Sequence, residues 1–252
     1  MRQIHNRILY TFLGFLIIGI ASTESFSSVL LNDSAKIIVR KTTDFIVTGD
    51  GNSVNWNNAD WLTITKQESS SSKSLLTQVK LLYSSQGIYF LFRCDDQKIT
   101  ATLQEDFAPL FKEDVVEVYL WPDQSVPIYF EYELSPLNFE LPILIPNIKG
   151  RVQGWAPWRY EGKRRTQHAT SVQGGEKKSH AAIRNWSAEF FIPFALLGSL
   201  IDGPPSSGAR WRANFYRIDY DEGYNTWSWQ KTTLAKAGNF HEYQKFGTIV
   251  FE

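Results

Sequence analysis

Apolar and polar residues alternate along much of this chain, and that alternation restricts the folds open to it. Every second position from 126 to 134 is apolar or aromatic, namely Val126, Ile128, Phe130, Tyr132 and Leu134. Tyr129, Glu131 and Glu133 occupy positions between them. Successive side chains of a strand point to opposite faces, so a period of two predicts a strand with one buried face.

The same pattern predicts further strands at residues 36–40, 76–83, 87–94, 115–121, 140–145, 166–172, 182–192, 210–219 and 246–251. Helix signals are confined to short turns at residues 193–198, which open with proline and close with glycine, and at residues 57–61. Many strands with few short helical turns predict an all-β fold, an antiparallel β-sandwich of jelly-roll or immunoglobulin-like type.

An apolar run over residues 8–21 follows Arg2 and Arg7 and precedes a stretch rich in serine. The run is shorter than the roughly 18 apolar residues of a spanning helix and has the length of a signal-peptide core. We therefore predict a signal peptide over residues 1–28 and one domain over residues 29–252. The protein would then be secreted or periplasmic, with no membrane contact after cleavage. An uncleaved N-terminal anchor is the alternative.

Charge and cysteine content narrow the classes of partner. Lys plus Arg and Asp plus Glu each number 26, so neither nucleic acid nor an anionic membrane is an expected partner. Cys94 is the only cysteine, which excludes an internal disulfide. Its position in an apolar, aromatic strand is typical of a small buried residue.

Recognisable catalytic and metal-binding motifs are missing from the sequence. His168, His180 and His241 show no metal-ligand spacing, and neither Gly-x-Ser-x-Gly nor a glycine-rich phosphate loop occurs. The sequence therefore predicts no catalytic residue and no metal site. Counting does not exclude a glycosidase pair of carboxylates, because that mechanism depends on a separation in space.

Aromatic side chains beside polar ones suggest sugar binding, because a sugar ring has apolar C–H faces and a hydroxyl edge. Trp227 and Trp229 lie beside a polar turn, and at least one of them is expected in the core if their segment is extended. Glu117 shares a predicted strand face with Val115 and Tyr119. It is a candidate acceptor for sugar hydroxyls, the alternative being a solvated carboxylate on the outer face.

Several short sequence segments, taken in their order along the chain, resemble the family 9 carbohydrate-binding modules and related family-9-like or DOMON-like domains of secreted bacterial proteins. They lie at residues 59–61, 88–96, 112–118, 186–194, 214–219 and 228–229. The resemblance implies a sandwich that clamps the end of a glycan between two tryptophans. Phe111 corresponds to the first clamp, where it replaces tryptophan, and Glu117 to the carboxylate. Trp229 corresponds to the second clamp, with Trp227 as the competing alignment and Asn225 as a nearby amide.

The function expected from this resemblance is that of a secreted, non-catalytic carbohydrate-binding protein. Its partners would be a plant or algal poly- or oligosaccharide and polysaccharide-degrading enzymes, in polysaccharide catabolism. No cofactor is expected, and a structural calcium ion is left open. One alternative is a glycoside hydrolase or its accessory. Another is a haem-binding electron-transfer domain, in which Met1, the only methionine, would be lost with the signal and leave no Met ligand.

Overall fold

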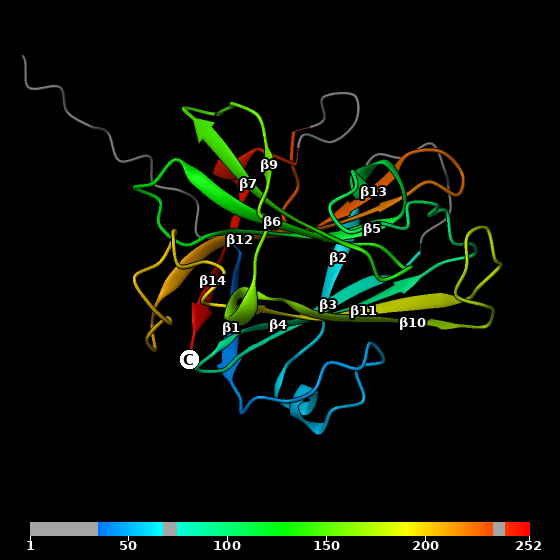
Figure 1. The fold of residues 1–252 in the computed structure, drawn as a ribbon, viewed down its shortest axis with the longest axis horizontal. Helices are drawn as coiled ribbons and strands as arrows, with labels where there is room; N and C mark the ends of the chain where they lie inside the picture. The colour runs from blue at the N-terminus through cyan, green and yellow to red at the C-terminus, as the bar shows by residue number, and fades with distance from the viewer. Residues whose placement is uncertain (1–34, 68–74, 234–239) are drawn as a thin grey trace, which may run out of the picture. The chain divides into compact units, whose positions relative to one another are not determined.

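Two β-sheets, one stacked on the other, make up the described part of the chain in a computed structural model (Figure 1). The structure describes residues 35–67, 75–233 and 240–252, so the predicted signal peptide lies outside it. The strands are β1 (Lys36–Lys41), β2 (Leu62–Lys66), β3 (Thr77–Tyr83), β4 (Gly87–Asp95), β5 (Val115–Trp121), β6 (Ile128–Leu134), β7 (Glu140–Ile148), β8 (Arg151–Val152), β9 (Ala156–Pro157), β10 (Gln167–Gln173), β11 (Asn185–Pro193), β12 (Arg210–Asp219), β13 (Asn225–Ser228) and β14 (Gly247–Phe251). The helical elements are short 3₁₀ turns, η1 (Val54–Asn58), η2 (Leu110–Lys112), η3 (Gly162–Arg164) and η4 (Tyr243–Lys245).

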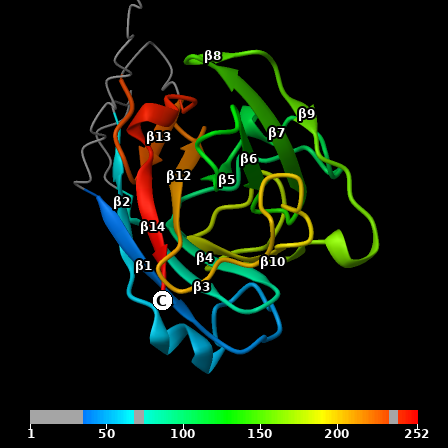
Figure 2. The same cartoon turned by 90° about the vertical axis from the view of Figure 1, so that its left-hand side faces the viewer.

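Strand order defines the two sheets. Sheet I runs β14-β12-β5-β6-β7, and sheet II runs β10-β11-β4-β3. Strand β1 joins them, because it pairs with β14 through residues 36–39 and with β3 through Arg40 and Lys41. Strand β2 makes a second link by pairing with β13 and β3. Figure 2 shows β1 and β2 along the side where the sheets meet.

The hydrophobic core lies between the sheets and follows from the period of two. Val116 and Val118 of β5 and Phe215 of β12 point inward from sheet I, and Phe90 and Phe92 of β4 point inward from sheet II. All five side chains have no exposed surface. The sequence predicted that β5 and β6 each have one buried face, with Glu117 and Glu131 on the other face. The two clusters confirm this division.

The outer face of sheet II is covered by the segment between β1 and β2. Trp56 and Phe45 from this segment pack on Tyr89 and Phe191. Glu189 of β11 is buried beneath it and accepts hydrogen bonds from the backbone N–H groups of residues 48 and 49 and from the Trp56 indole, at 2.8, 2.7 and 2.7 Å. The segment thus closes over Glu189, and this buried carboxylate is fully supplied with donors.

The outer face of sheet I carries a second apolar cluster that includes Tyr119, Tyr129, Ile143 and Tyr216. Loops cover it only in part, with Phe111, Tyr220 and Tyr224 half-buried along its margin. An open region remains above β5, β6 and β7, and it holds the candidate site.

The predicted all-β sandwich is confirmed, with local differences. Two pairings are parallel, those of β1 with β14 and with β3, because β1 enters between strands that already run in its direction. Strands β8, β9 and β13 are too short or too polar to show a clear period of two, and the short alternating strand β2 was not among the predicted strands. The turn predicted at residues 193–198 follows β11 directly, and the one predicted at residues 57–61 lies at η1 instead.

All described residues belong to one compact unit, Asn32–Glu252. Within the described ranges, no helix has the length and apolar character needed to cross a membrane.

Candidate functional site

A pocket of about 580 Å³ opens on the outer face of sheet I. Its apolar floor is formed by Tyr119 of β5, Ile143 and Ile145 of β7 and Ile218 of β12. These residues occupy outward positions of adjacent strands, so the flat surface of the sheet brings them side by side. The volume falls within the usual range for small-molecule sites.

Three glutamates lie among these apolar residues, and we call Glu117, Glu131 and Glu133 the acidic trio. In the antiparallel register of β5 and β6, Glu117 is opposite Glu133 and Tyr119 is opposite Glu131. One carboxylate oxygen from each of the three lies within 4.8 Å of the others. The exposed fractions of the three residues are only 1%, 3% and 0%.

Several carboxylate oxygens of the acidic trio lack a hydrogen-bond partner within the described part of the chain. Glu117 Oε2, Glu131 Oε2 and both carboxylate oxygens of Glu133 have no hydrogen-bond partner among the described residues. A buried carboxylate without donors is costly, because the desolvation of its charge is not compensated. All three glutamates line the pocket, so a ligand there would lie beside carboxyl groups that the protein itself leaves partly unsatisfied.

Burial and mutual repulsion make the trio hold its protons. Burial, followed by the charge of Glu131, raises the pKa of Glu117 well above its usual value. Burial raises the pKa of Glu131 to about 7. For Glu133 burial again dominates, and the charges of Glu117 and Glu131 raise its pKa further. Near neutral pH the empty pocket is therefore less anionic than three free carboxylates would be.

Aromatic rings stand at the opening of the pocket. Phe111, in η2, is half-buried and meets Trp155 edge to face, with 6.2 Å between ring centroids and 81° between planes. Trp155 is 47% exposed. Tyr220 and Tyr224 form a second edge-to-face pair at 5.5 Å, and the Tyr220 hydroxyl donates to the Phe111 carbonyl oxygen at 3.1 Å. These rings offer flat apolar faces next to buried acceptors.

The pocket contains no cationic side chain among the described residues that line it. His241 is the one imidazole there, and its Nδ1 lies 2.8 Å from the Tyr129 hydroxyl. Burial lowers the pKa of His241 to about 4, so this ring is neutral at physiological pH. The described lining thus combines acceptors, aromatic faces and aliphatic surface without a positive charge.

The structure brings two of the predicted site residues together. Phe111 and Glu117 both line the pocket, although their contact with sugar stays a prediction. Glu131, Glu133, Tyr220, Tyr224 and Trp155 join them there, and none of these five belongs to the predicted set of sugar-binding residues. The signal was present for Glu131 and Glu133, because both share the outer face of a predicted strand. The pairing of that strand with β5 was not readable from the sequence.

Trp227, Trp229 and Asn225 lie on the opposite side of sheet I, so the predicted grouping is corrected. Trp227 is 1% exposed and belongs to the core, where the Arg217 guanidinium lies 4.7 Å from its ring centroid. Trp229 stacks on the inward ring of Phe215 at 5.3 Å and 13°. Asn225 borders a small cavity of about 20 Å³ beside Trp227.

The register of β13 explains this placement. Asn225 pairs with Asp219 and Trp227 pairs with Arg217 on the neighbouring strand β12. Arg217 is an inward position, because it alternates with the outward residues Tyr216 and Ile218 of the second cluster. Residues two apart share a face of a strand, so Asn225 and Trp227 both point inward. A stacking role for Trp227 does not fit its burial.

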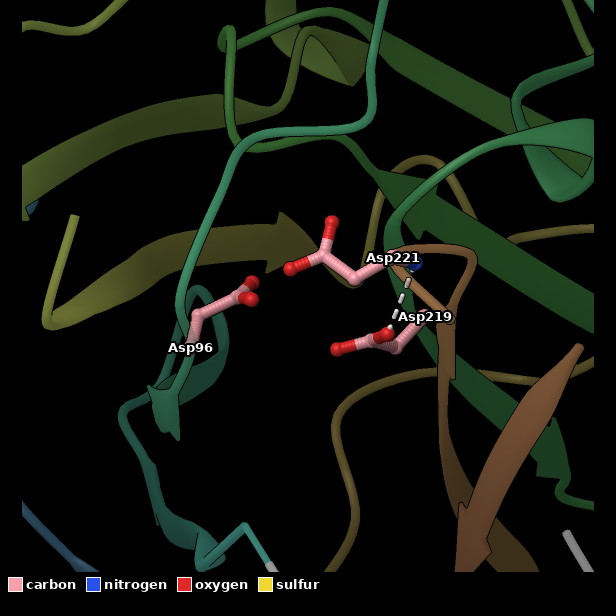
Figure 3. A group of neighbouring side chains, drawn as sticks. All are labelled: Asp96, Asp219 and Asp221. Atoms are coloured by element: carbon pink, nitrogen blue, oxygen red, sulfur yellow. Dashed lines mark hydrogen bonds between the residues drawn. The ribbon is translucent and has the colours of Figure 1, made fainter. Parts of the chain in front are cut away.

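A second acidic group, the aspartate trio of Asp96, Asp219 and Asp221, has a different environment (Figure 3). Arg217 Nη2 lies 3.1 Å from Asp96 Oδ2 and 2.7 Å from Asp219 Oδ2. Lys98 Nζ lies 3.6 Å from Asp221 Oδ1. The close carboxylates of either trio have the geometry for a metal ion, but in the aspartate trio the protein's own cations, Arg217 and Lys98, already offset part of the negative charge.

The fold and this pocket define an all-β sandwich protein with a ligand-sized hollow on one outer sheet face. Residues 47–141 match the family described as "Carbohydrate family 9 binding domain-like". The matched segment contains Phe111 and the whole acidic trio. The predicted resemblance to family 9 carbohydrate-binding modules is thereby confirmed.

Solved structures share the fold at low sequence identity. A protein of Bacteroides uniformis ATCC 8492 to which carbohydrate binding is ascribed has 15% identity and a TM-score of 0.71, over 86% of this chain and 99% of its own. A family 9 carbohydrate-binding module of Caldicellulosiruptor kristjanssonii with cellotriose has 16% identity and a TM-score of 0.58, over 86% and 93%. A family 9 module from that organism in complex with glucose has 15% identity and a TM-score of 0.59, over 86% of this chain and 95% of its own. The comparison with curated proteins gave no match.

Proposed function

We propose that this protein is a non-catalytic carbohydrate-binding protein that holds one or two sugar units in the pocket around Phe111 and Glu117. The observation that carries the proposal is the pairing of exposed aromatic faces with buried, unsatisfied carboxylate oxygens in one pocket. The family 9 match over residues 47–141, and structural neighbours that bind cellotriose and glucose, support it.

Each part of the pocket would meet a different part of a sugar. The faces of Phe111, Trp155, Tyr220 or Tyr224 would cover the apolar C–H face of a ring. Glu117, with its oxygen Oε2 unpartnered, would accept hydrogen bonds from ring hydroxyls, which can replace the water lost on burial. The replacement of tryptophan by Phe111 gives a smaller face at the first clamp.

An estimate of the binding free energy gives an affinity that suits a module which keeps a protein close to a polysaccharide. A ring that hides roughly 60 Å² of apolar surface contributes about 1.5 kcal/mol. Two charge-assisted hydrogen bonds add about 1.5 to 3 kcal/mol each before ordering costs. A total of about 4 to 8 kcal/mol corresponds to dissociation constants from micromolar to millimolar.

The arrangement of the carboxylates favours binding over hydrolysis. A glycosidase places its two carboxyl groups on either side of the scissile bond. Here the three glutamates project from the same face of adjacent strands, β5 and β6, with oxygens within 4.8 Å of one another. They would therefore contact the same side of a sugar. We further propose export, and a role beside enzymes that degrade polysaccharides, on the basis of the predicted signal peptide and the family resemblance.

Calorimetric titration with cellotriose and glucose, followed by a glycan array, tests the proposal. Wild-type protein should bind at least one glycan, and Phe111→Ala should weaken that binding. Trp61→Ala is the matched control, because Trp61 is a half-buried aromatic residue on the outer face of sheet II, beside Lys80 and Arg93. Equal loss in both variants, or no binding by folded wild-type protein to any glycan, would overturn the proposal.

A further inference from the structure

The acidic trio differs from Glu189 and from the aspartate trio in the groups that surround its carboxylates. Glu189 receives three N–H donors, and the aspartate trio receives Arg217 and Lys98. The acidic trio has four carboxylate oxygens with no hydrogen-bond partner, and no described lining residue of its pocket is a lysine or arginine. A bound molecule that brings a positive charge and several donors would complement these oxygens.

A neutral sugar supplies only part of what the acidic trio lacks. A hydroxyl group donates one hydrogen bond and brings no charge, whereas a primary ammonium group donates three and accepts none. Glu117, Glu131 and Glu133 each have at least one unpartnered oxygen, and these groups face a common point in the pocket. One ammonium group can thus be matched by one oxygen of each glutamate.

The remaining lining also suits an organic cation. Tyr119 lies two residues from Glu117 on β5, and Tyr220 and Tyr224 also line the pocket, so electron-rich rings share the pocket with the acids. A calcium ion would need six to eight oxygen ligands, and most of the other described lining is aromatic or aliphatic. The pocket volume of about 580 Å³ accommodates a whole sugar ring with its substituent.

We propose that the pocket selects sugars that carry a free primary amine, with the ammonium group placed among Glu117, Glu131 and Glu133. This inference rests on the proposed sugar-binding function and specifies the class of sugar. It implies that an N-acetylated sugar binds less well, because acetylation removes the charge and two of the three donors.

The test compares glucosamine, glucose and N-acetylglucosamine by calorimetric titration of the full chain near neutral pH. Glucosamine should bind about tenfold or more tightly than either neutral sugar, because charge-assisted hydrogen bonds are roughly twice as strong as neutral ones. The ratio of glucosamine to glucose affinity should fall toward one in Glu133→Gln. It should be kept in Glu176→Gln, which makes the same substitution at an exposed loop position.

The outcomes separate this inference from the function on which it rests. If glucose or cellotriose binds and glucosamine has no advantage, the amine selectivity is overturned while sugar binding stands. If calcium chloride binds at the acidic trio and glucosamine does not displace it, the amine selectivity is overturned as well. Absence of binding by every sugar overturns both proposals. The comparison of sugars on wild-type protein does not depend on the folding of any variant.

Discussion

Glu117 on β5 stands directly opposite Glu133 on β6, and oxygens of the two carboxyl groups lie within 4.8 Å of each other. Like charges directly opposite each other destabilise a sheet, and burial makes the repulsion stronger. Glu131 adds a third acid from the next outward position of β6. The glutamate pair therefore lowers the stability of the ligand-free protein. A ligand that brings a positive charge or several hydrogen-bond donors can restore this stability when it binds.

Because the pKa of Glu131 is raised in the folded protein, the free energy of unfolding depends on pH. Burial raises this pKa from 4.5 to about 7, so the folded state keeps a proton that the unfolded state releases. Stability is therefore full below about pH 4.5 and falls as pH rises through 7. Glu117 contributes with the same sign, because burial raises its pKa too. His241 acts oppositely, since its lowered pKa, about 4, costs stability as pH falls below 6.5.

Glu131→Gln should remove part of this pH dependence. Relative to wild type, the variant should gain free energy of unfolding as pH rises from 5 to 8. The gain should approach about 3 kcal/mol, from a shift of about 2.5 pKa units. Urea denaturation at several pH values measures it, and the His241 contribution is common to both proteins. A difference between the two proteins that stays constant across this range would contradict the assigned shift.

Phe111 should respond to a change of ring size. Phe111→Ala should weaken glycan binding by about 1.5 kcal/mol through lost ring contact. Phe111→Trp should tighten binding, because a larger face meets the sugar, provided that the indole fits beside Trp155, whose centroid is now 6.2 Å away. Calorimetry with a bound glycan checks both. Unchanged affinity in the alanine variant, with the protein folded, would place the stacking surface elsewhere in the pocket.

The exported protein should begin between residues 22 and 29, after the apolar run and within the serine-rich stretch. N-terminal sequencing of protein recovered outside the cytoplasm gives the answer. A sequence that starts at Met1 would favour the uncleaved anchor instead. Deletion of residues 1–28 is the companion experiment, and it should leave the fold intact because the described sandwich begins with β1 at Lys36.

How much of this molecule the sequence predicts depends on the range of the interactions involved. The period of two places Glu117, Glu131 and Glu133 on outer faces of β5 and β6, because alternation is a local property of each strand. The register that brings the three together is set by pairing between strands, which no single strand encodes. The opening illustrates the same limit, since Phe111, Trp155 and Tyr220 come from three distant loops.

Strand β13 shows that local composition can predict the wrong environment when the strand is buried by its pairing partners. Its sequence, Asn225 to Ser228, has one tryptophan among polar residues and no apolar face, which favours an exposed position. Its pairing with β12 on one side and β2 on the other buries all four residues. The partners of β13 therefore decide the environment of Trp227, and its own residues do not.

The placement of Trp227 leads to a prediction opposite in kind to a binding role. Trp227→Ala should lower the free energy of unfolding by about 3 to 5 kcal/mol, because it removes a fully buried ring from the core. It also takes away the ring against which the Arg217 guanidinium lies at 4.7 Å. Chemical denaturation measures the loss, and titration of the fraction that remains folded should show nearly unchanged glycan affinity. If the variant were as stable as wild type but no longer bound the glycan, Trp227 would instead be assigned to the binding site.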